Sequence, residues 1–154
     1  MKIYIGLLVF LFIGCYKEQT TIYTADLSNT NTHSIVIRPY FSGLVPPNKV
    51  ITLTANGTFQ IAKGSDRGIV NNGGFDSYIF GGSDSTVVIF DNTYSITHYT
   101  TQPTMFAPKY YLVSSNRNLR NKDSYIYSYK DINNTRRESN YLYNFTEQDF
   151  LDSH

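Results

Sequence analysis

Short apolar runs, several of them alternating with polar residues, recur along this chain between clusters of Gly, Pro, Asn and Asp. Runs of this length that are rich in β-branched and aromatic residues are typical of β-strands. Strands are expected over residues 21–27, 34–41, 50–55, 58–62, 78–80, 86–90, 94–99, 110–113, 124–129 and 141–145. No window shows a sustained apolar period of 3.6 residues, so the pattern predicts at most short helices.

Two tight connections are expected between neighbouring strands. Asn56-Gly57 separates the segments 50–55 and 58–62, and a two-residue Asn-Gly connection is a strong hairpin signal. Residues 91–93 (DNT) separate 86–90 from 94–99 and predict a second hairpin. The segment 86–90 (TVVIF) is almost continuously apolar, which predicts a strand buried on both faces.

The end of the chain carries the signal for one short helix. Thr146 is a good N-cap residue, and Glu147 and Asp149 place carboxylates in the first turn, where the helix dipole favours them. Phe150 and Leu151 are expected to pack this turn on the sheet.

Seven to nine short strands separated by turns predict an all-β, antiparallel β-sandwich, with a small barrel as the alternative. About 140 residues remain after the N-terminal segment described below, enough for one domain with its own core. The single β domain is expected over residues 31–154.

The first 14 residues have the layout of a secretory signal peptide. Lys2 precedes an apolar stretch over residues 3–13, which is too short for the roughly 20 residues of a membrane-spanning helix. Gly14 supplies the small residue at the expected cleavage site. Residues 1–14 are therefore expected to be removed.

Cys15 is the only cysteine and directly follows that site. The stretch 11–15 (LFIGC) resembles a bacterial lipoprotein box, with Phe12 at the position where leucine is usual. The resemblance implies that Cys15 carries a diacylglycerol. The residues that follow are polar and lack apolar periodicity, so residues 15–30 are expected to form a lipidated tether. An ordinary secreted protein with one free, buried cysteine is the alternative.

The charges argue against nucleic acid as a partner. Removal of Lys2 leaves 12 Lys and Arg against 12 Asp and Glu, a net charge of zero. Phosphate binding requires a surplus of Lys and Arg on one face, and the zero net charge predicts no polybasic patch for anionic lipid either. Contact with the membrane is therefore expected through the lipid anchor.

The sequence holds no recognisable catalytic or metal-binding motif. His33, His98 and His154 lie far apart, without HExxH or a cysteine partner, so no metal and no cofactor are expected. A GxSxG nucleophile motif is also missing. A non-catalytic role is the main hypothesis. Two carboxylates that meet in the fold would still allow a hydrolase of envelope glycans or peptides.

Tyrosines are the most distinctive residues of the chain, with 14 Tyr and no Trp. Strand alternation places Tyr125, Tyr127 and Tyr129 on one face, and Tyr141 and Tyr143 together on another strand. Rings with hydroxyl tips suit the binding of a sugar or a peptide. The alternative is that these rings form the sheet's own core or cross-strand pairs.

Two further segments carry a family resemblance. Residues 84–92 (DSTVVIFDN) and 141–150 (YLYNFTEQDF), together with the lipoprotein box, are similar to a group of small envelope lipoproteins of Bacteroidota-type bacteria. The resemblance implies a β-fold lipoprotein of the outer membrane and no particular activity. Asp84-Ser85-Thr86 also resembles the O-glycosylation sequon of these bacteria, which implies a glycan on Ser85.

Three hypotheses for the function follow. The first is a non-catalytic envelope lipoprotein that binds a protein or glycan partner through its β domain. The second is a structural subunit that donates or accepts a strand at a sheet edge. The third is the envelope hydrolase.

Overall fold

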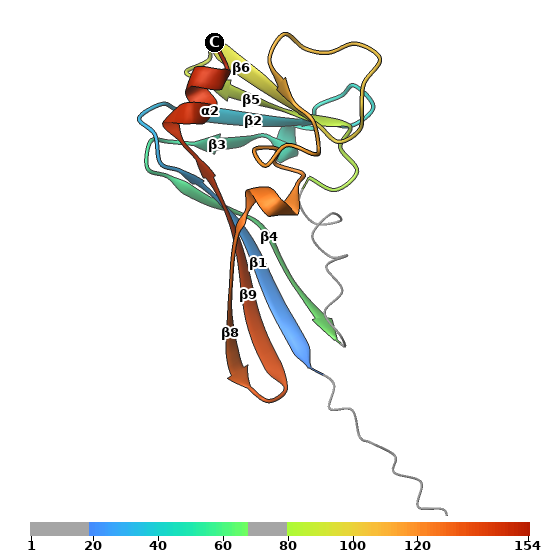
Figure 1. Cartoon of the computed structure of the whole chain (residues 1–154), viewed down its shortest axis with the longest axis vertical. Coiled ribbons are helices and arrows are strands. Elements are labelled where there is room, and N and C mark those ends of the chain that lie inside the picture. The colour runs from blue at the N-terminus through green and yellow to red at the C-terminus, as the bar shows by residue number, and fades with distance from the viewer. Residues whose placement is uncertain (1–18, 68–79) are drawn as a thin grey trace, which may run out of the picture.

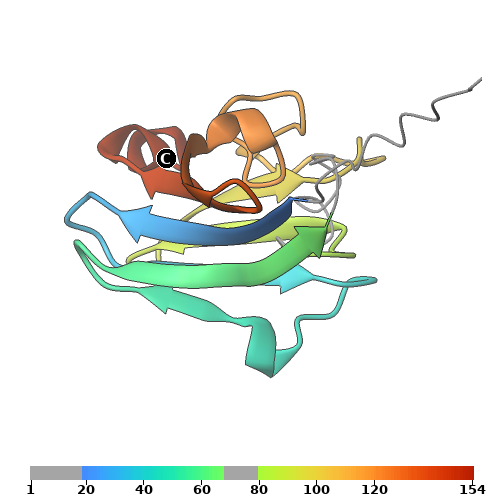
Figure 2. The ribbon, with the colours of Figure 1, turned by 90° about the horizontal axis from the view of Figure 1, so that it is seen from below.

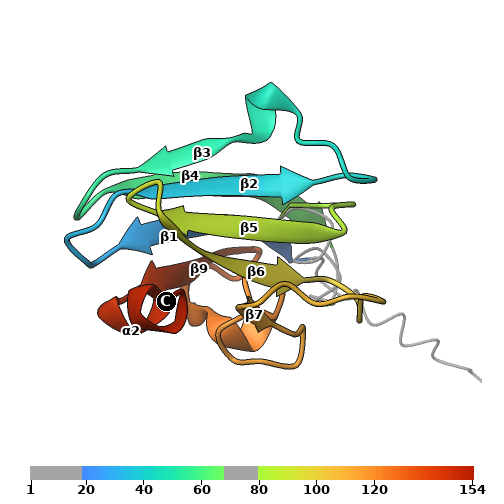
Figure 3. The ribbon, with the colours of Figure 1, turned by 90° about the horizontal axis from the view of Figure 1, so that it is seen from above.

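The computed structural model describes residues 19–67 and 80–154, and their strands form two packed sheets (Figures 2 and 3). One sheet has the strand order β4-β1-β9-β8, and the other has the order β3-β2-β5-β6-β7. The four-stranded sheet comprises β4 (Thr58–Arg67), β1 (Thr20–Asn29), β9 (Arg136–Phe145) and β8 (Ile126–Asn133). The five-stranded sheet comprises β3 (Ile51–Leu53), β2 (Ile35–Tyr40), β5 (Ser85–Phe90), β6 (Tyr94–Tyr99) and β7 (Tyr110–Tyr111).

The predicted all-β sandwich is confirmed, and the two sheets do not close into a barrel. Nine of the expected segments contain a strand, and β1, β4, β8 and β9 are longer than expected. The segment 78–80 lies outside the described residues except for Phe80, which is not in a strand. The structure also contains two short 3-10 helices, η1 (Pro47–Lys49) and η2 (Lys122–Ser124).

The sheets are mixed, so the expectation of purely antiparallel pairing is wrong for two strand pairs. β1 pairs with β9 in parallel, with Thr20 opposite Arg136 and Asn29 opposite Phe145. β6 and β7 also run in parallel. Both pairs join strands separated by a long stretch of chain, and parallel neighbours require such a crossover.

Both sheets direct their apolar residues into one core. The four-stranded sheet contributes Leu27, Tyr143 and Phe145, and the five-stranded sheet contributes Ile37 and Phe90 among others, all fully buried. Burying such side chains stabilises the fold by about 1.5–3 kcal/mol each.

Strand β5 is buried on one face only, contrary to the expectation from its apolar run. Thr86, Val88 and Phe90 are buried, whereas Val87 and Ile89 are half-buried. The five-stranded sheet has the four-stranded sheet on its inner face alone, which explains the alternation.

The folded domain begins earlier than expected. β1 starts at Thr20 and lies inside the four-stranded sheet, between β4 and β9. The tether expected over residues 15–30 therefore extends no further than residue 19, and the β domain does not begin at residue 31.

One of the two expected hairpins is present. Asp91 and Asn92 adopt φ values of 48° and 57° and join β5 to β6, whose antiparallel pairing is complete. The Asn56-Gly57 turn does form, with the Gly57 amide donating to the Thr54 carbonyl over 2.9 Å. The hairpin expected there is wrong, because β3 and β4 belong to different sheets.

The expected C-terminal helix is α2 (Glu147–Asp152). The amide of Thr146 donates to the carboxylate of Asp149, completing a capping box. Phe150 packs against the core as expected. Leu151 is 55% exposed, so its expected contact with the sheet is wrong.

The four-stranded sheet is longer than the sheet on which it packs. In Figure 1, the lower ends of its strands extend beyond the five-stranded sheet, at the end opposite α2. We call this part the projecting half; it comprises residues 20–24, 63–67, 127–133 and 136–141. Its inner face continues the core-facing side of the sheet, and its outer face is the opposite side.

Candidate binding surface

All five tyrosines singled out in the sequence share the inner face of β8 and β9. Tyr127 pairs with Tyr141 across the two strands, which places these rings side by side with centroids 5.0 Å apart. Tyr125 precedes β8, and its ring lies 5.4 Å from that of Tyr143. The structure therefore brings the five rings together.

Two of the five belong to the core. Tyr143 is fully buried and Tyr125 is 6% exposed. Their hydroxyls donate to the Arg117 and Leu119 carbonyls over 2.7 and 2.9 Å. Burial raises the pKa of both phenols above the ordinary value. For Tyr125 and Tyr143, the core interpretation holds.

The other three tyrosines form an accessible cluster on the projecting half, which we call the aromatic face. Tyr127 and Tyr129 are 46% and 58% exposed, and their rings stack with centroids 6.0 Å apart. Tyr141 is half-buried beside them. Burial, followed by the nearby Tyr127, raises the pKa of Tyr141. Tyr141 therefore stays in the neutral phenol form at physiological pH. A phenol hydroxyl can both donate and accept a hydrogen bond.

A charged pair borders the aromatic face. The guanidinium of Arg137 lies 4.4 Å from the ring centre of Tyr129, and its Nε donates to Asp131 over 2.7 Å. This hydrogen bond lowers the pKa of Asp131 and raises that of Arg137, so both groups are charged at neutral pH. Cation–π contact and the carboxylate together hold the guanidinium beside the ring.

The outer face of the projecting half carries a shallow depression of about 490 Å³. Its lining includes Thr24, Lys63, Ser128, Lys130 and Asn140. These residues come from four strands and are brought together only by the register of the sheet. Sequence reasoning missed this site, because Lys63 and Lys130 lie far apart in the sequence.

His33 and His154 both contact the ring of Phe150, and His98 lies in the core. His33 stacks on Phe150 with centroids 3.5 Å apart, and its Nδ1 lies 2.6 Å from Asp91. His98 is buried and accepts a hydrogen bond from the Leu119 amide over 3.0 Å. Within residues 19–67 and 80–154, no three His, Cys, Asp or Glu side chains gather in a way that could hold a metal ion.

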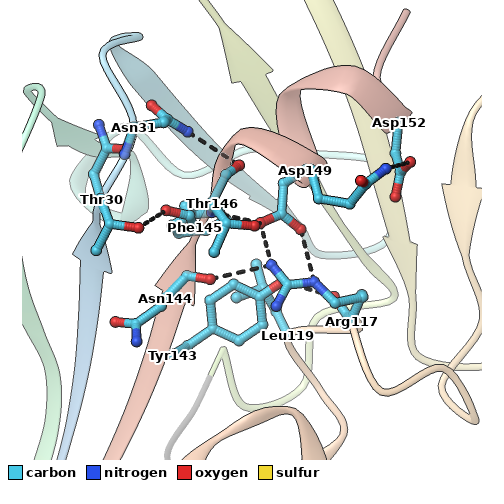
Figure 4. A network of polar contacts seen from close by, with 12 residues as sticks. Thr30, Asn31, Arg117, Leu119, Tyr143, Asn144, Phe145, Thr146, Asp149 and Asp152 are labelled. Carbon is cyan, nitrogen blue, oxygen red and sulfur yellow. Dashed lines mark hydrogen bonds and ion pairs between the residues drawn. The ribbon is translucent and has the colours of Figure 1, made fainter.

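A partly buried ion pair joins Arg117 to Asp149, and it is structural (Figure 4). Arg117 binds Asp149 and also donates to the Asn144 carbonyl over 3.1 Å. Burial raises the pKa of Asp149, and the Thr146 amide and Arg117 oppose that shift. Every group in this cluster contacts another part of the chain, which fits a role in closing the fold.

Ser85, the residue of the O-glycosylation resemblance, is the first residue of β5. It is half-buried, and Thr86 beside it is fully buried. Gly14 and Cys15, the expected cleavage and lipidation sites, lie outside the described residues. Among the residues that are described, no helix has the length and apolar character to cross a membrane.

In comparisons with known proteins, no family model, curated protein or solved structure matches this chain.

Proposed function

We propose that this protein is a non-catalytic lipoprotein of the bacterial cell envelope that binds a protein or glycan partner through the aromatic face. Cleavage after Gly14 and lipidation of Cys15 anchor it to a membrane, the outer membrane by the family resemblance. The observation that carries the binding role is the exposure of Tyr127 and Tyr129 on a part of the sheet that the second sheet does not cover.

The aromatic face has the chemistry that a sugar or peptide requires. Ring faces offer apolar contact, and the hydroxyls, together with the Arg137–Asp131 pair, offer oriented hydrogen bonds. Tyr127 already has its hydroxyl 3.2 Å from Ser139 Oγ, which holds its ring in place before any ligand arrives. Side chains that are already ordered lose less entropy on binding.

The anchor is tested by the intact mass of the protein purified from its own cells. The expected result is a chain that begins at Cys15 and carries a diacylglycerol, with further acylation at its amino terminus. Cys15→Ser should give an unprocessed or soluble chain. A mature chain with a free cysteine thiol would contradict the proposed anchor.

The binding role is tested on arrays of envelope glycans and on envelope proteins, with the mature chain as the probe. Tyr127→Ala and Tyr129→Ala should each weaken binding at least tenfold without changing the fold. Tyr110→Ala is the matched control, because Tyr110 is 40% exposed but lies on β7 of the other sheet. Equal loss with the control, or no loss in any variant, would contradict the role of the aromatic face.

A second candidate function is assembly through a sheet edge. A groove of about 280 Å³, lined by both apolar and polar residues, lies beside β3 and β4, the edge strands on one side of the sandwich. Phe41, Phe59 and Ile61 line it, and Phe59 is 44% exposed. An added strand would pair with β4 and place side chains in this groove. Sedimentation of the mature chain over a hundredfold concentration range tests it, and Phe59→Ser should abolish any polymer.

A further inference from the structure

The outer face of the projecting half concentrates positive charge, although the whole chain is almost neutral. Starting from the tip, Arg67, Thr20 and Arg136 lie side by side, followed by Ser65, Ile22, Glu138 and Lys130, and then by Lys63, Thr24, Asn140 and Ser128. These three rows hold four cations and one carboxylate. The chain as a whole has 13 Lys and Arg against 12 Asp and Glu.

From this distribution we infer that the outer face lies on a membrane surface and binds the phosphate groups of anionic lipids. The inference rests on the proposed lipid anchor, and it adds the face of the protein that meets the lipid. The aromatic face, on the other side of the same sheet, then points away from the membrane and toward a partner.

The cations of this face are available to a ligand. Lys63 and Lys130 make no ion pair within the described residues, and both are exposed. Arg136 shares its charge with Glu138 over 3.0 Å. Asp26, in the fourth row, lies nearer the sandwich. A net surplus of three positive charges remains in the three rows at the tip.

The depression between these cations supplies further hydrogen-bond donors. Thr24 donates its hydroxyl to the Asn140 side-chain oxygen over 3.1 Å, which leaves the Asn140 amide nitrogen as a donor. Ser128 adds a hydroxyl from the neighbouring strand. A phosphate group has several acceptor oxygens, and the two ammonium groups with these neutral donors match them.

Chain length places this face near the lipid. Cys15 precedes Thr20, the first residue of β1, by five positions, and five residues span at most about 18 Å when fully extended. Thr20 is at the tip of the projecting half, beside Arg67 and Arg136. An acyl chain on Cys15 therefore keeps the first cationic row, Arg67 and Arg136, within about two or three Debye lengths of the headgroups at physiological salt.

The expected strength follows from the number of charges. Each Lys or Arg close to an anionic surface strengthens binding by roughly fivefold. A surplus of three charges therefore favours docking by roughly a hundredfold, which is enough to fix the orientation of a protein that the anchor already holds at the membrane.

The test uses the lipidated mature protein in vesicles and compares two adjacent positions on β4. Ser65 lies on the outer face and Asp66 on the inner face, at the same distance from the tip, and both are exposed. A fluorophore is attached at Ser65→Cys or Asp66→Cys, because an acylated Cys15 does not react. Nitroxide headgroup lipids then quench whichever label lies on the membrane.

In vesicles with about one third phosphatidylglycerol, quenching at position 65 should exceed that at position 66 at least threefold. The difference should vanish in pure phosphatidylcholine and at 1 M salt, where the Debye length is about 3 Å. Lys63→Glu with Lys130→Glu should also abolish it. Lys49→Glu with Lys122→Glu is the control, because it makes the same charge change on η1 and η2, outside the projecting half.

Equal quenching at the two positions in anionic vesicles would overturn the inference, as would a difference that survives the Lys63 and Lys130 reversals. Duplex DNA that displaces the face from vesicles at equal phosphate concentration would make it a general polyanion surface and overturn the lipid assignment. The intact mass separates the two proposals: a chain without acylation refutes the anchor, whereas an acylated chain without a preferred face refutes only the orientation.

Discussion

The guanidinium of Arg117 binds the carboxylate of Asp149, with Nε 3.0 Å from Oδ1, and so ties the loop before β8 to the C-terminal helix. The side chain of Asp149 is only 2% exposed, whereas that of Arg117 is 28% exposed. The ring centre of Tyr143 lies 5.1 Å from the guanidinium carbon of Arg117. The Tyr143 hydroxyl donates a hydrogen bond to the Arg117 carbonyl. The loop before β8, the helix α2 and the core therefore contact one another at the Arg117–Asp149 pair.

Asp149→Ala should lower the free energy of unfolding by about 3 kcal/mol, because it removes both the partner of Arg117 and the capping box of α2. Urea unfolding of Asp149→Ala, Arg117→Met and the double variant measures the coupling. The double variant should lose at least about 1 kcal/mol less than the sum of the single losses. Additive losses would show that the pair contributes nothing as a unit.

Stability should fall with acidification below pH 6.5 because of His98. Burial, with a smaller effect of Arg117, lowers the pKa of His98 from 6.5 to about 3. The unfolded state therefore binds more protons than the folded state between pH 6.5 and about 3, and this stability is lost as the pH falls through that range. Protonation would also end the hydrogen bond that Nδ1 accepts from the Leu119 amide.

Between pH 7 and pH 5 the loss attributable to His98 should be about 2 kcal/mol. Denaturant unfolding at the two pH values, for the natural protein and for His98→Gln, measures it. Gln retains an acceptor for the Leu119 amide but does not titrate. The variant should therefore be less stable at pH 7 but show a flatter pH dependence, and an unchanged slope would refute the assignment.

Tyrosines of the same face should differ sharply in their effect on stability. Tyr143→Ala should cost about 3–5 kcal/mol, because its ring is fully buried. Tyr143→Phe should cost only about 1 kcal/mol, for the hydrogen bond to the Arg117 carbonyl. Tyr129→Ala should cost less than about 1 kcal/mol, because the ring is 58% exposed. Thermal unfolding of the three variants ranks them, and similar losses would contradict the division of the cluster.

Gly64 should tolerate no side chain while Tyr23 is opposite. A Cβ at position 64 would overlap the Tyr23 hydroxyl and the ring carbon that bears it. Because Tyr23 is only 9% exposed, its ring cannot move aside freely, and Gly64→Ala should cost about 1–3 kcal/mol. The same change in a Tyr23→Val background should cost less, as measured by urea unfolding. An equal cost in both backgrounds would rule out the clash.

Local signals in the sequence were sufficient for the strands and for the helix. The Asp91-Asn92 turn is short enough to fix which strands it joins, and Thr146 and Asp149 define the start of α2 by themselves. The Asn56-Gly57 signal was correct about a turn and wrong about a hairpin. A turn fixes the local direction of the backbone, whereas the sheet that β4 joins depends on its pairing with β1, far away in the sequence.

The binding surface could not be predicted from the alternation of residues along the strands alone. Alternation correctly placed Tyr125 and Tyr127 on one face, but it could not show that Tyr125 is buried in the core and that Tyr127 is exposed. The cationic rows were equally hidden, because Lys63 and Lys130 share a surface only through the register of four strands. The net charge of a chain does not show how its charged residues are distributed between the two faces of a sheet.

The parallel pairing of β1 with β9 determines when the domain can fold. β1 is the first described strand of the chain and β9 is the last, yet they are neighbours inside one sheet. Because synthesis proceeds from the N-terminus, β1 cannot pair with β9 until almost the whole chain has been made. Contacts between such distant segments also slow folding. The order of the strands therefore means that the four-stranded sheet can be completed only after β9, its last strand, has been synthesised.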